Sequence, residues 1–166
     1  MSQMNKHGLG NSAEYLVCYE LQRNSIPVWQ LGGNNKRWDI VFQIGEDEFV
    51  PGQVKARTQS TISFKTEDLK PSKGYYFIYF CPDLSTHSNS LRLAKQLMRI
   101  TDEKLGSPTA STLLIYSSDK VLGMLERAQG RSSNVGKASL ITNLTEQDIY
   151  AGLDGRLTFF QLYGRK

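Results

Sequence analysis

The chain has 166 residues, of which 39% are hydrophobic and 22% charged, a composition that is typical of a globular protein and excludes long disorder. This length allows a sizeable core without disulfides or a structural metal, so we expect a single domain over residues 1–166. The 20 Lys and Arg against 16 Asp and Glu give a net charge of +4, which favours an anionic partner without identifying one.

The first predicted element is a helix. Apolar residues recur at helical spacing between Ala13 and Asn24, and Asn11 and Ser12 precede them as N-cap candidates. Glu14 extends the apolar stripe, so we expect it to face the sheet rather than water. The alternative is a capping box between Asn11 and Glu14, which would stabilise the helix end by about 1 kcal/mol and supply no chemistry.

A short strand and a β-hairpin are predicted next. IPVWQL at 26–31 has the composition of a strand, and GGNN at 32–35 predicts a turn. Residues 38–44 and 48–55 alternate between apolar and polar and predict the hairpin. If its turn closes between Ile44 and Glu48, Asp39 lies directly opposite Gln53. Pro51-Gly52 is the point where a bulge would shift this register.

The register places polar side chains together on one face of the hairpin. Directly opposed residues hold their Cβ atoms about 4.5–5.5 Å apart, so the oxygens of Asp39 and Gln53 can converge on one cation. Lys55 shares their face, and Glu14 can reach over the sheet to complete a cluster of oxygen ligands. The opposite face is predicted to be apolar and to contain Trp38, Ile40, Phe42, Val50 and Val54.

The remaining sequence continues an α/β pattern. After a polar loop, the periodicity predicts a short helix near 66–70, a sheet-centre strand at 75–80, a helix at 90–104, a strand at 112–117, helices at 119–128 and 145–153, and a closing strand at 156–163. Thr145 is the expected N-cap of the last helix, and residues 130–137 are expected to form a loop. The predicted fold class is α/β, a mixed sheet flanked by helices.

Three segments resemble one family of nucleases. GNSAEYLVCYEL at 10–21, WDIVF at 38–42 and QVKAR at 53–57 are similar to the PD-(D/E)XK superfamily, which includes Holliday-junction resolvases, restriction enzymes and homing endonucleases. The chain looks most like the branch with a helical glutamate and with glutamine in place of the second acid. The resemblance implies a restriction-endonuclease-like core over about residues 8–82, with a C-terminal elaboration over about 83–166.

The resemblance also implies an activity and a set of site residues. It implies a Mg²⁺-dependent endodeoxyribonuclease, with Mn²⁺ as a substitute, whose catalytic residues are Glu14, Asp39, Gln53 and Lys55. Asp39 would be the principal metal ligand, supported by Glu14 and Gln53, while Lys55 would serve the attacking water. The backbone carbonyl of Val54 is a further candidate ligand. An ammonium and a cation suit this reaction because negative charge develops on the phosphate oxygens.

Other interpretations stay open. Gln53 supplies a neutral oxygen where a carboxylate is commonest, so the chain could instead be a catalytically inactive module that binds DNA or takes part in an assembly. Asp39 and Lys55 could form a cross-strand ion pair worth about 0.2–1 kcal/mol. A third alternative is that the polar face of the hairpin binds a protein partner.

DNA is the expected partner. Lys36, Arg37 and Arg57 flank the candidate site and are predicted to contact DNA phosphates, although solvated side chains at strand ends are the alternative. Cutting both strands of a duplex calls for a homodimer or a larger symmetric assembly. The first residues lack an apolar signal core, and no apolar run reaches membrane-spanning length. We therefore expect a cytoplasmic protein with no membrane partner.

Overall fold

The structure is a computed structural model that describes residues 6–33, 37–82, 88–129 and 139–164. Its centre is a five-stranded sheet in the order β1-β2-β3-β5-β6. The strands are β1 (Val28–Gln30), β2 (Ile40–Gly45), β3 (Glu48–Arg57), β5 (Tyr75–Phe80) and β6 (Thr112–Ser117). Because β3 and β5 run parallel while the other neighbours are antiparallel, the sheet is mixed. The predicted α/β class, a mixed sheet with flanking helices, is confirmed.

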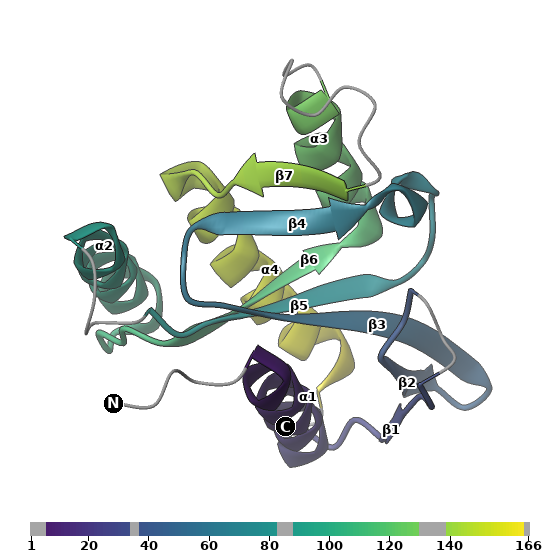
Figure 1. Cartoon of the computed structure of the whole chain (residues 1–166). Coiled ribbons are helices and arrows are strands. Elements are labelled where there is room, and N and C mark those ends of the chain that lie inside the picture. Colours follow the sequence, from purple (N-terminus) through teal and green to yellow (C-terminus); the bar gives the residue numbers. More distant parts are fainter. Residues whose placement is uncertain (1–5, 34–36, 83–87, 130–138, 165–166) are drawn as a thin grey trace.

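Helices cover both faces of this sheet (Figure 1). They are α1 (Lys6–Arg23), the 3-10 helix η1 (Thr66–Leu69), α2 (Ser88–Leu105), α3 (Ser118–Gln129) and α4 (Glu146–Tyr163). A second, two-stranded sheet pairs β4 (Thr61–Lys65) with β7 (Ser139–Asn143). Within the described ranges, no helix combines the length and the apolar character that a membrane crossing requires.

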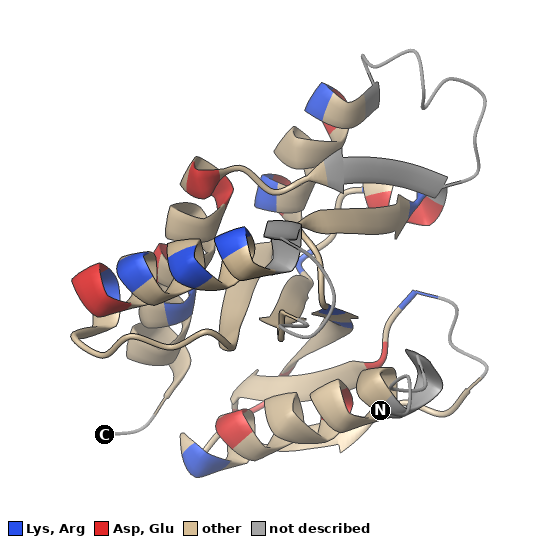
Figure 2. Cartoon of the chain, turned by 60° about the vertical axis from the view of Figure 1, so that its left-hand side comes forward, with Lys and Arg blue, Asp and Glu red and all other residues tan. Residues whose placement is uncertain are grey.

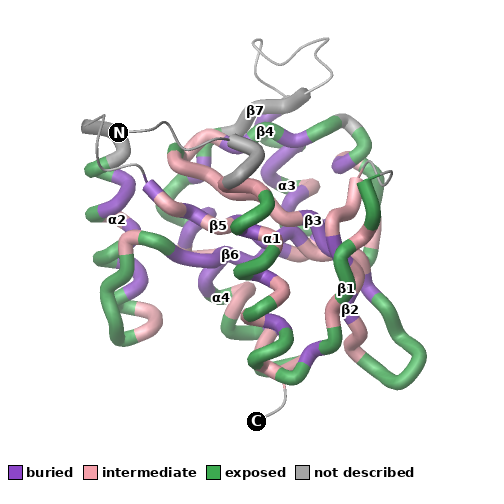
Figure 3. The backbone as a smooth tube through the Cα atoms, turned by 60° about the horizontal axis from the view of Figure 1, so that its bottom comes forward, coloured by how far each residue is buried: buried purple, intermediate pink, exposed green. Residues whose placement is uncertain are grey.

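The buried side chains form two clusters, one on each face of the sheet. Figure 3 shows where buried residues lie along the backbone of the strands and the helices that cover them. The α1 layer lies between the sheet and α1, and includes Val17, Leu21, Ile40, Phe42, Val50, Phe77 and Phe159. The α2–α3 layer includes Phe64, Tyr76, Ile78, Leu97, Val121, Leu125 and Leu153. Strand β5 supplies side chains to both clusters, as expected of a strand that is apolar on both faces.

Helix α1 begins earlier than its N-cap candidates indicated. It starts at Lys6, so Asn11 and Ser12 lie inside the helix and their predicted role as N-caps is wrong. Ala13, Val17 and Leu21 are buried against the sheet, which confirms the predicted apolar stripe. A capping box needs its first residue at the helix end. The capping-box alternative for Glu14 is therefore wrong.

The hairpin has the predicted register along most of its length. Ile40 pairs with Gly52 and Phe42 with Val50, as predicted, but the paired residues begin at Ile40. Asp39 lies just before β2 and its N–H donates to the Gly52 carbonyl, so the predicted pairing of Asp39 with Gln53 is not part of the ladder. The turn differs from the prediction, because Gly45 pairs with Glu48 and the irregularity lies between Gln43 and Gly45. Pro51 stays in register with Val41, so the expected position of the bulge was wrong.

Trp38 does not share the apolar face of Ile40 and Phe42. Its ring lies 5.7 Å from that of Tyr76 and packs against the α2–α3 layer. Trp38 precedes the paired residues of β2, so strand alternation does not fix its direction. Gly74 makes room for the ring, since a Cβ there would lie 2.4 Å from Trp38. The predicted placement of Trp38 was wrong.

The C-terminal segment differs most from the sequence prediction. Residues 156–163 continue α4 instead of forming a strand. Thr145 is the N-cap, as predicted, and its hydroxyl accepts a hydrogen bond from the Asp148 N–H at 3.2 Å. The β-prone residues stay helical because Phe159 packs edge-on against Phe42 and Phe77. Strands β4 and β7 were not predicted, while most of the expected loop at 130–137 and part of the turn at 32–35 lie outside the described residues.

Candidate active site

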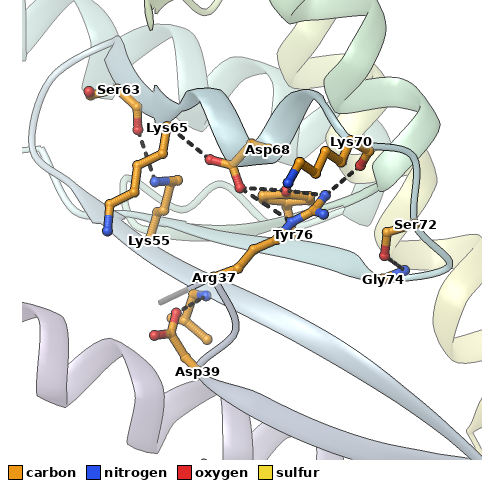
Figure 4. A network of polar contacts seen from close by, with 11 residues as sticks. Arg37, Asp39, Lys55, Ser63, Lys65, Asp68, Lys70, Ser72, Gly74 and Tyr76 are labelled. Atoms are coloured by element: carbon orange, nitrogen blue, oxygen red, sulfur yellow. Dashed lines mark hydrogen bonds and ion pairs between the residues drawn. The ribbon is translucent and has the colours of Figure 1, made fainter. Parts of the chain in front are cut away.

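Asp39 is fixed at the point where the chain enters β2. Its backbone N–H donates to the Gly52 carbonyl at 2.9 Å, and its carbonyl accepts from the Leu31 N–H at 2.8 Å. Its Oδ2 accepts a hydrogen bond of 2.8 Å from the Val54 N–H (Figure 4). The carboxylate is therefore oriented by the neighbouring strand, and Figure 4 shows it directed towards α1.

Gln53 is buried in β3, with 8% of its surface exposed. Its Oε1 atom accepts no hydrogen bond from the part of the chain that the structure describes. A buried acceptor without a donor costs about 1–3 kcal/mol, so such atoms are uncommon in folded proteins. A cation or an ordered water would remove this cost.

Glu14 on α1 and Asp39 before β2 are two partly buried carboxyl groups, and the charge of Asp39 acts on Glu14. Glu14 is half-buried on α1, where burial and then the negative charge of Asp39 raise the pKa of its carboxyl. Burial also raises the pKa of Asp39, and the charge of Asp68 adds to this effect. The Val54 N–H, Lys55 and Lys65 act in the opposite direction. Two partly desolvated carboxylates near each other form a place that a cation would stabilise.

Lys55 lies on the same face of β3 as Gln53, since the two residues are two positions apart. Its Nζ donates to the Ser63 carbonyl of β4 at 2.9 Å and lies 5.1 Å from the centre of the Phe64 ring. Burial lowers the pKa of Lys55, whereas the charges of Asp68 and Asp39 favour its protonated form. Among the described residues no ion pair joins Lys55 to Asp39. The cross-strand ion pair considered above is therefore not formed.

The oxygen donors around Asp39 are of the kinds that Mg²⁺ prefers. Glu14 and Asp39 supply carboxylates and Gln53 an amide oxygen. Because the N–H and C=O of one strand residue point the same way, the Val54 carbonyl points to the side where Asp39 lies. Within the described ranges, no three His, Cys, Asp or Glu side chains are placed to share a metal. The donor set fits a hard cation that keeps some of its waters, as Mg²⁺ does.

The arginines that were predicted to contact DNA hold neighbouring backbone. Arg57 donates to the Thr61 carbonyl at 2.6 Å and to the Thr61 hydroxyl at 3.3 Å, which fastens β3 to β4. The Arg37 side chain is 16% exposed and donates to the Lys70 carbonyl at 2.7 Å. Lys36 lies outside the described residues. DNA contact by these three residues stays a prediction.

A buried acid next to the site was missed from the sequence. Asp68 in η1 is 1% exposed. Its Oδ1 accepts from the Tyr76 hydroxyl at 2.7 Å and lies 3.8 Å from Arg37 Nε, while its Oδ2 accepts from the Lys65 N–H at 2.8 Å. In the sequence TEDLK this acid is indistinguishable from a solvated one, because its partners Arg37 and Tyr76 are distant along the chain.

Comparisons with known proteins give matches among solved structures but none among family models or curated proteins. Among solved structures, the chain is similar to Hjc, a Holliday junction resolvase from the hyperthermophilic archaeon Archaeoglobus fulgidus. The TM-score is 0.45 and the sequence identity 11%, over 85% of this chain and 86% of the resolvase. The similarity is one of backbone arrangement, and the resolvase activity is a property of that protein.

Proposed function

We propose that the chain is a Mg²⁺-dependent endodeoxyribonuclease that hydrolyses phosphodiester bonds. The observation that carries the proposal is the buried Gln53 Oε1, which lacks a hydrogen-bond donor among the described residues and lies on the strand opposite Asp39. An amide oxygen in this state is suited to ligate a cation. A cation or an ordered water would satisfy this acceptor, and the carboxylate of Asp39, held by the N–H of the next residue, Val54, favours the cation.

In this proposal each residue has a distinct role. Asp39 is the principal metal ligand, and Glu14, the Gln53 amide oxygen and the Val54 carbonyl support it. A bound Mg²⁺ lowers the pKa of a water and stabilises charge on the phosphate. The Val54 N–H holds the Asp39 carboxylate in one orientation, so the ligand needs little rearrangement.

Lys55 is proposed to act on the phosphate and the attacking water. An ammonium group has three N–H donors, of which one is committed to the Ser63 carbonyl. The other two can orient a water and contact a phosphate oxygen where negative charge develops. The hydrogen bond to β4 fixes the position of the ammonium and leaves two N–H donors for water and phosphate.

The structure removes two simpler explanations of these residues. Glu14 does not cap the first helix, which begins at Lys6. Asp39 forms a hydrogen bond with Val54 rather than an ion pair with Lys55. Neither a capping box nor an ion pair therefore accounts for these two carboxylates, which supports the proposal.

Cleavage assays with the full chain test this function. Supercoiled plasmid, four-way junctions and single strands are incubated with Mg²⁺, Mn²⁺ or a chelator. We expect metal-dependent nicking that is lost in Asp39→Ala and kept in Asp47→Ala, a control that removes an exposed acid from the hairpin turn. Lys55→Ala should reduce the rate by roughly 10²–10³-fold, by analogy with loss of a preorganised donor.

Other outcomes favour the other interpretations. Salt-sensitive DNA binding without nicking would indicate a nuclease-like module that has lost cleavage. No retention of DNA at low salt would indicate a protein partner instead. Assembly into a homodimer or larger oligomer and a cytoplasmic location stay predictions, which sedimentation equilibrium and cell fractionation would check.

A further inference from the structure

We propose that Lys65 is a second phosphate-binding cation of the site, which contacts the nucleic-acid backbone beside the reacting phosphate. The inference deepens the proposed function and rests on it. Its ligand is defined by chemistry: the non-bridging oxygens of a phosphodiester strand.

Among the cations that the sequence suggested for this task, Lys36 lies outside the described residues, and the others donate hydrogen bonds to neighbouring backbone. Lys55 donates to the Ser63 carbonyl, and Arg57 to both the carbonyl and the hydroxyl of Thr61. Arg37 donates to the Lys70 carbonyl and lies close to Asp68. The two arginines hold β4 and the end of η1 in place, which limits their ability to bind a strand of DNA, whereas Lys55 keeps two N–H donors for the reacting phosphate.

Lys65 differs from them in its surroundings. It is exposed at the end of β4, and its ammonium has no hydrogen-bond acceptor or ion-pair partner among the described residues. Figure 4 shows the side chain extended next to Lys55. Its charge lowers the pKa of both Asp39 and Lys55, which places the ammonium near the two principal groups of the site.

The backbone of Lys65 is held by hydrogen bonds, whereas its side-chain ammonium is not. Its N–H donates to Asp68 Oδ2 at 2.8 Å, and the residue pairs with Ser139 of β7. Asp68 is itself held by the hydroxyl of Tyr76. Because the backbone of Lys65 is fixed and its ammonium has no partner among the described residues, only the side chain must be ordered when an external ligand binds.

Electrostatics determine which ligand this ammonium would take. Lys55 and Lys65 carry like charges close to each other, an arrangement that is unfavourable until an anion lies between or beside them. Gln53 is neutral where a carboxylate is commonest in the family that the chain resembles. The site therefore carries less negative charge, which makes the approach of a phosphate easier. A phosphodiester next to Asp39 would meet Lys55 on its buried side and Lys65 on its exposed side.

Metal-free DNA binding tests the inference without requiring cleavage. A short fluorescein-labelled duplex is titrated with the full chain in a chelator over a range of salt concentrations. The variants are Lys65→Ala, Lys65→Arg and Lys95→Ala. Lys95 is an exposed control on α2, a helix with several Lys and Arg residues (Figure 2).

One lost phosphate contact has a calculable effect. Each contact contributes about 0.9 to the slope of log affinity against log salt, which corresponds to roughly eightfold in affinity at about 0.1 M salt. Lys65→Ala should therefore bind about eightfold more weakly, with a slope that is smaller by about 0.9. Lys65→Arg should stay close to wild type because it keeps the charge, and Lys95→Ala should change little.

The outcomes separate this inference from the proposed function. If the wild type binds DNA and Lys65→Ala weakens binding no more than Lys95→Ala, the inference is overturned while the nuclease proposal stands. An equal loss in Lys65→Arg and Lys65→Ala would also overturn it, because charge would not be the cause. If the wild type retains no DNA at low salt, both proposals fall. Thermal unfolding confirms that the variants are folded.

Discussion

At the scale of a single residue, the buried amide of Gln53 matters both for stability and for the proposed binding of a cation. This amide lies in β3 with Oε1 unpaired among the described residues, one position before Val54, whose N–H binds the Asp39 carboxylate. A carboxylate at this position would add a ligand charge but would also bury a third acid. The residue type at position 53 thus sets a balance between the stability of the metal-free protein and its affinity for a cation.

Gln53→Glu should lower stability without metal and increase the response to metal. A buried carboxylate near two others lacks a partner, and we expect a loss of about 1–3 kcal/mol in the free energy of unfolding in chelator. Added Mg²⁺ should recover this loss and raise the melting temperature more than in the wild type. Thermal unfolding with and without Mg²⁺ measures both effects.

Gln53→Met is the matched control for this change. It keeps the approximate volume and removes the unpaired acceptor, so stability without metal should be similar or higher. Its stabilisation by Mg²⁺ should be smaller than that of the wild type. Equal Mg²⁺ responses in wild type and Gln53→Met would show that the amide oxygen is not a ligand.

Asp68 is expected to be the most sensitive charged residue for stability. Asp68→Ala removes a carboxylate that is 1% exposed and accepts hydrogen bonds from the Tyr76 hydroxyl and the Lys65 N–H, and each hydrogen bond lost to a charged group costs about 1.5–3 kcal/mol. Tyr76→Phe removes one hydrogen bond to a charged group and should cost about 1.5–3 kcal/mol. Urea unfolding measures both. The exposed control Asp47→Ala should stay within about 0.5 kcal/mol of wild type, and equal effects at Asp47 and Asp68 would contradict the prediction.

At the scale of the elements, close packing between α4 and β6 depends on glycine. A Cβ at Gly155 would lie 2.2 Å from the Ile115 carbonyl oxygen, which is backbone and cannot move aside easily. We expect Gly155→Ala to destabilise the protein by about 1–3 kcal/mol, because overpacking outweighs the gain in helix propensity. Denaturant unfolding gives the sign and the size of the change.

Gly123 in α3 provides the opposite case. It is exposed, and a Cβ there would meet nothing within 4 Å. Gly123→Ala should therefore stabilise the protein by about 0.5–1 kcal/mol through helix propensity and the reduced entropy of the unfolded chain. If both alanine variants were stabilising, the close approach of α4 to β6 would be wrong.

Elements set by local alternation were predictable, whereas those set by distant contacts were not. The register of β2 and β3 follows from the alternation around Ile40 and Phe42, and it predicted that Asp39 would lie at the end of the hairpin next to β3. The layer of Trp38 depends on the space above Gly74, which no nearby residue reveals. Residues 156–163 are β-prone in composition, yet the burial of Phe159 among distant aromatic rings keeps them helical.

The same distinction holds for the candidate site. Glu14, Asp39, Gln53 and Lys55 could be selected because they belong to short segments with a known pattern. Strand β4, which accepts the hydrogen bond from Lys55, is polar and short and was taken for a loop. Its strand structure comes from pairing with β7, about 80 residues further along the chain, which local sequence does not indicate.

The two hydrophobic clusters bind the whole molecule into one unit. Strand β5 contributes to both, and its neighbour β6 comes from the segment that the sequence resemblance set apart as an elaboration. Helix α4 packs Leu153 into the α2–α3 layer and Phe159 into the α1 layer. The candidate site lies on strands that depend on these contacts for their cover.

A fragment of residues 1–82 should therefore fail to fold alone. It loses β6 from the edge of β5 and loses Phe159 from its packing against Phe42 and Phe77. Removal of one buried Phe side chain typically costs about 3–5 kcal/mol, and a whole domain is stable by only about 5–15 kcal/mol. Loss of several such side chains exceeds that margin, so circular dichroism and proton NMR should show an unfolded fragment.

Mixing the fragment with its complement provides the control. Residues 1–82 and 83–166, expressed together, retain every pairing between the strands of the central sheet and should recover a dispersed NMR spectrum and a cooperative thermal transition. Such recovery would show that missing partners, rather than a damaged sequence, unfold the isolated fragment. A fragment of residues 1–82 that unfolded cooperatively on its own would instead mean that the first half is an independent core, and the dependence of the site on α4 and β6 would have to be abandoned.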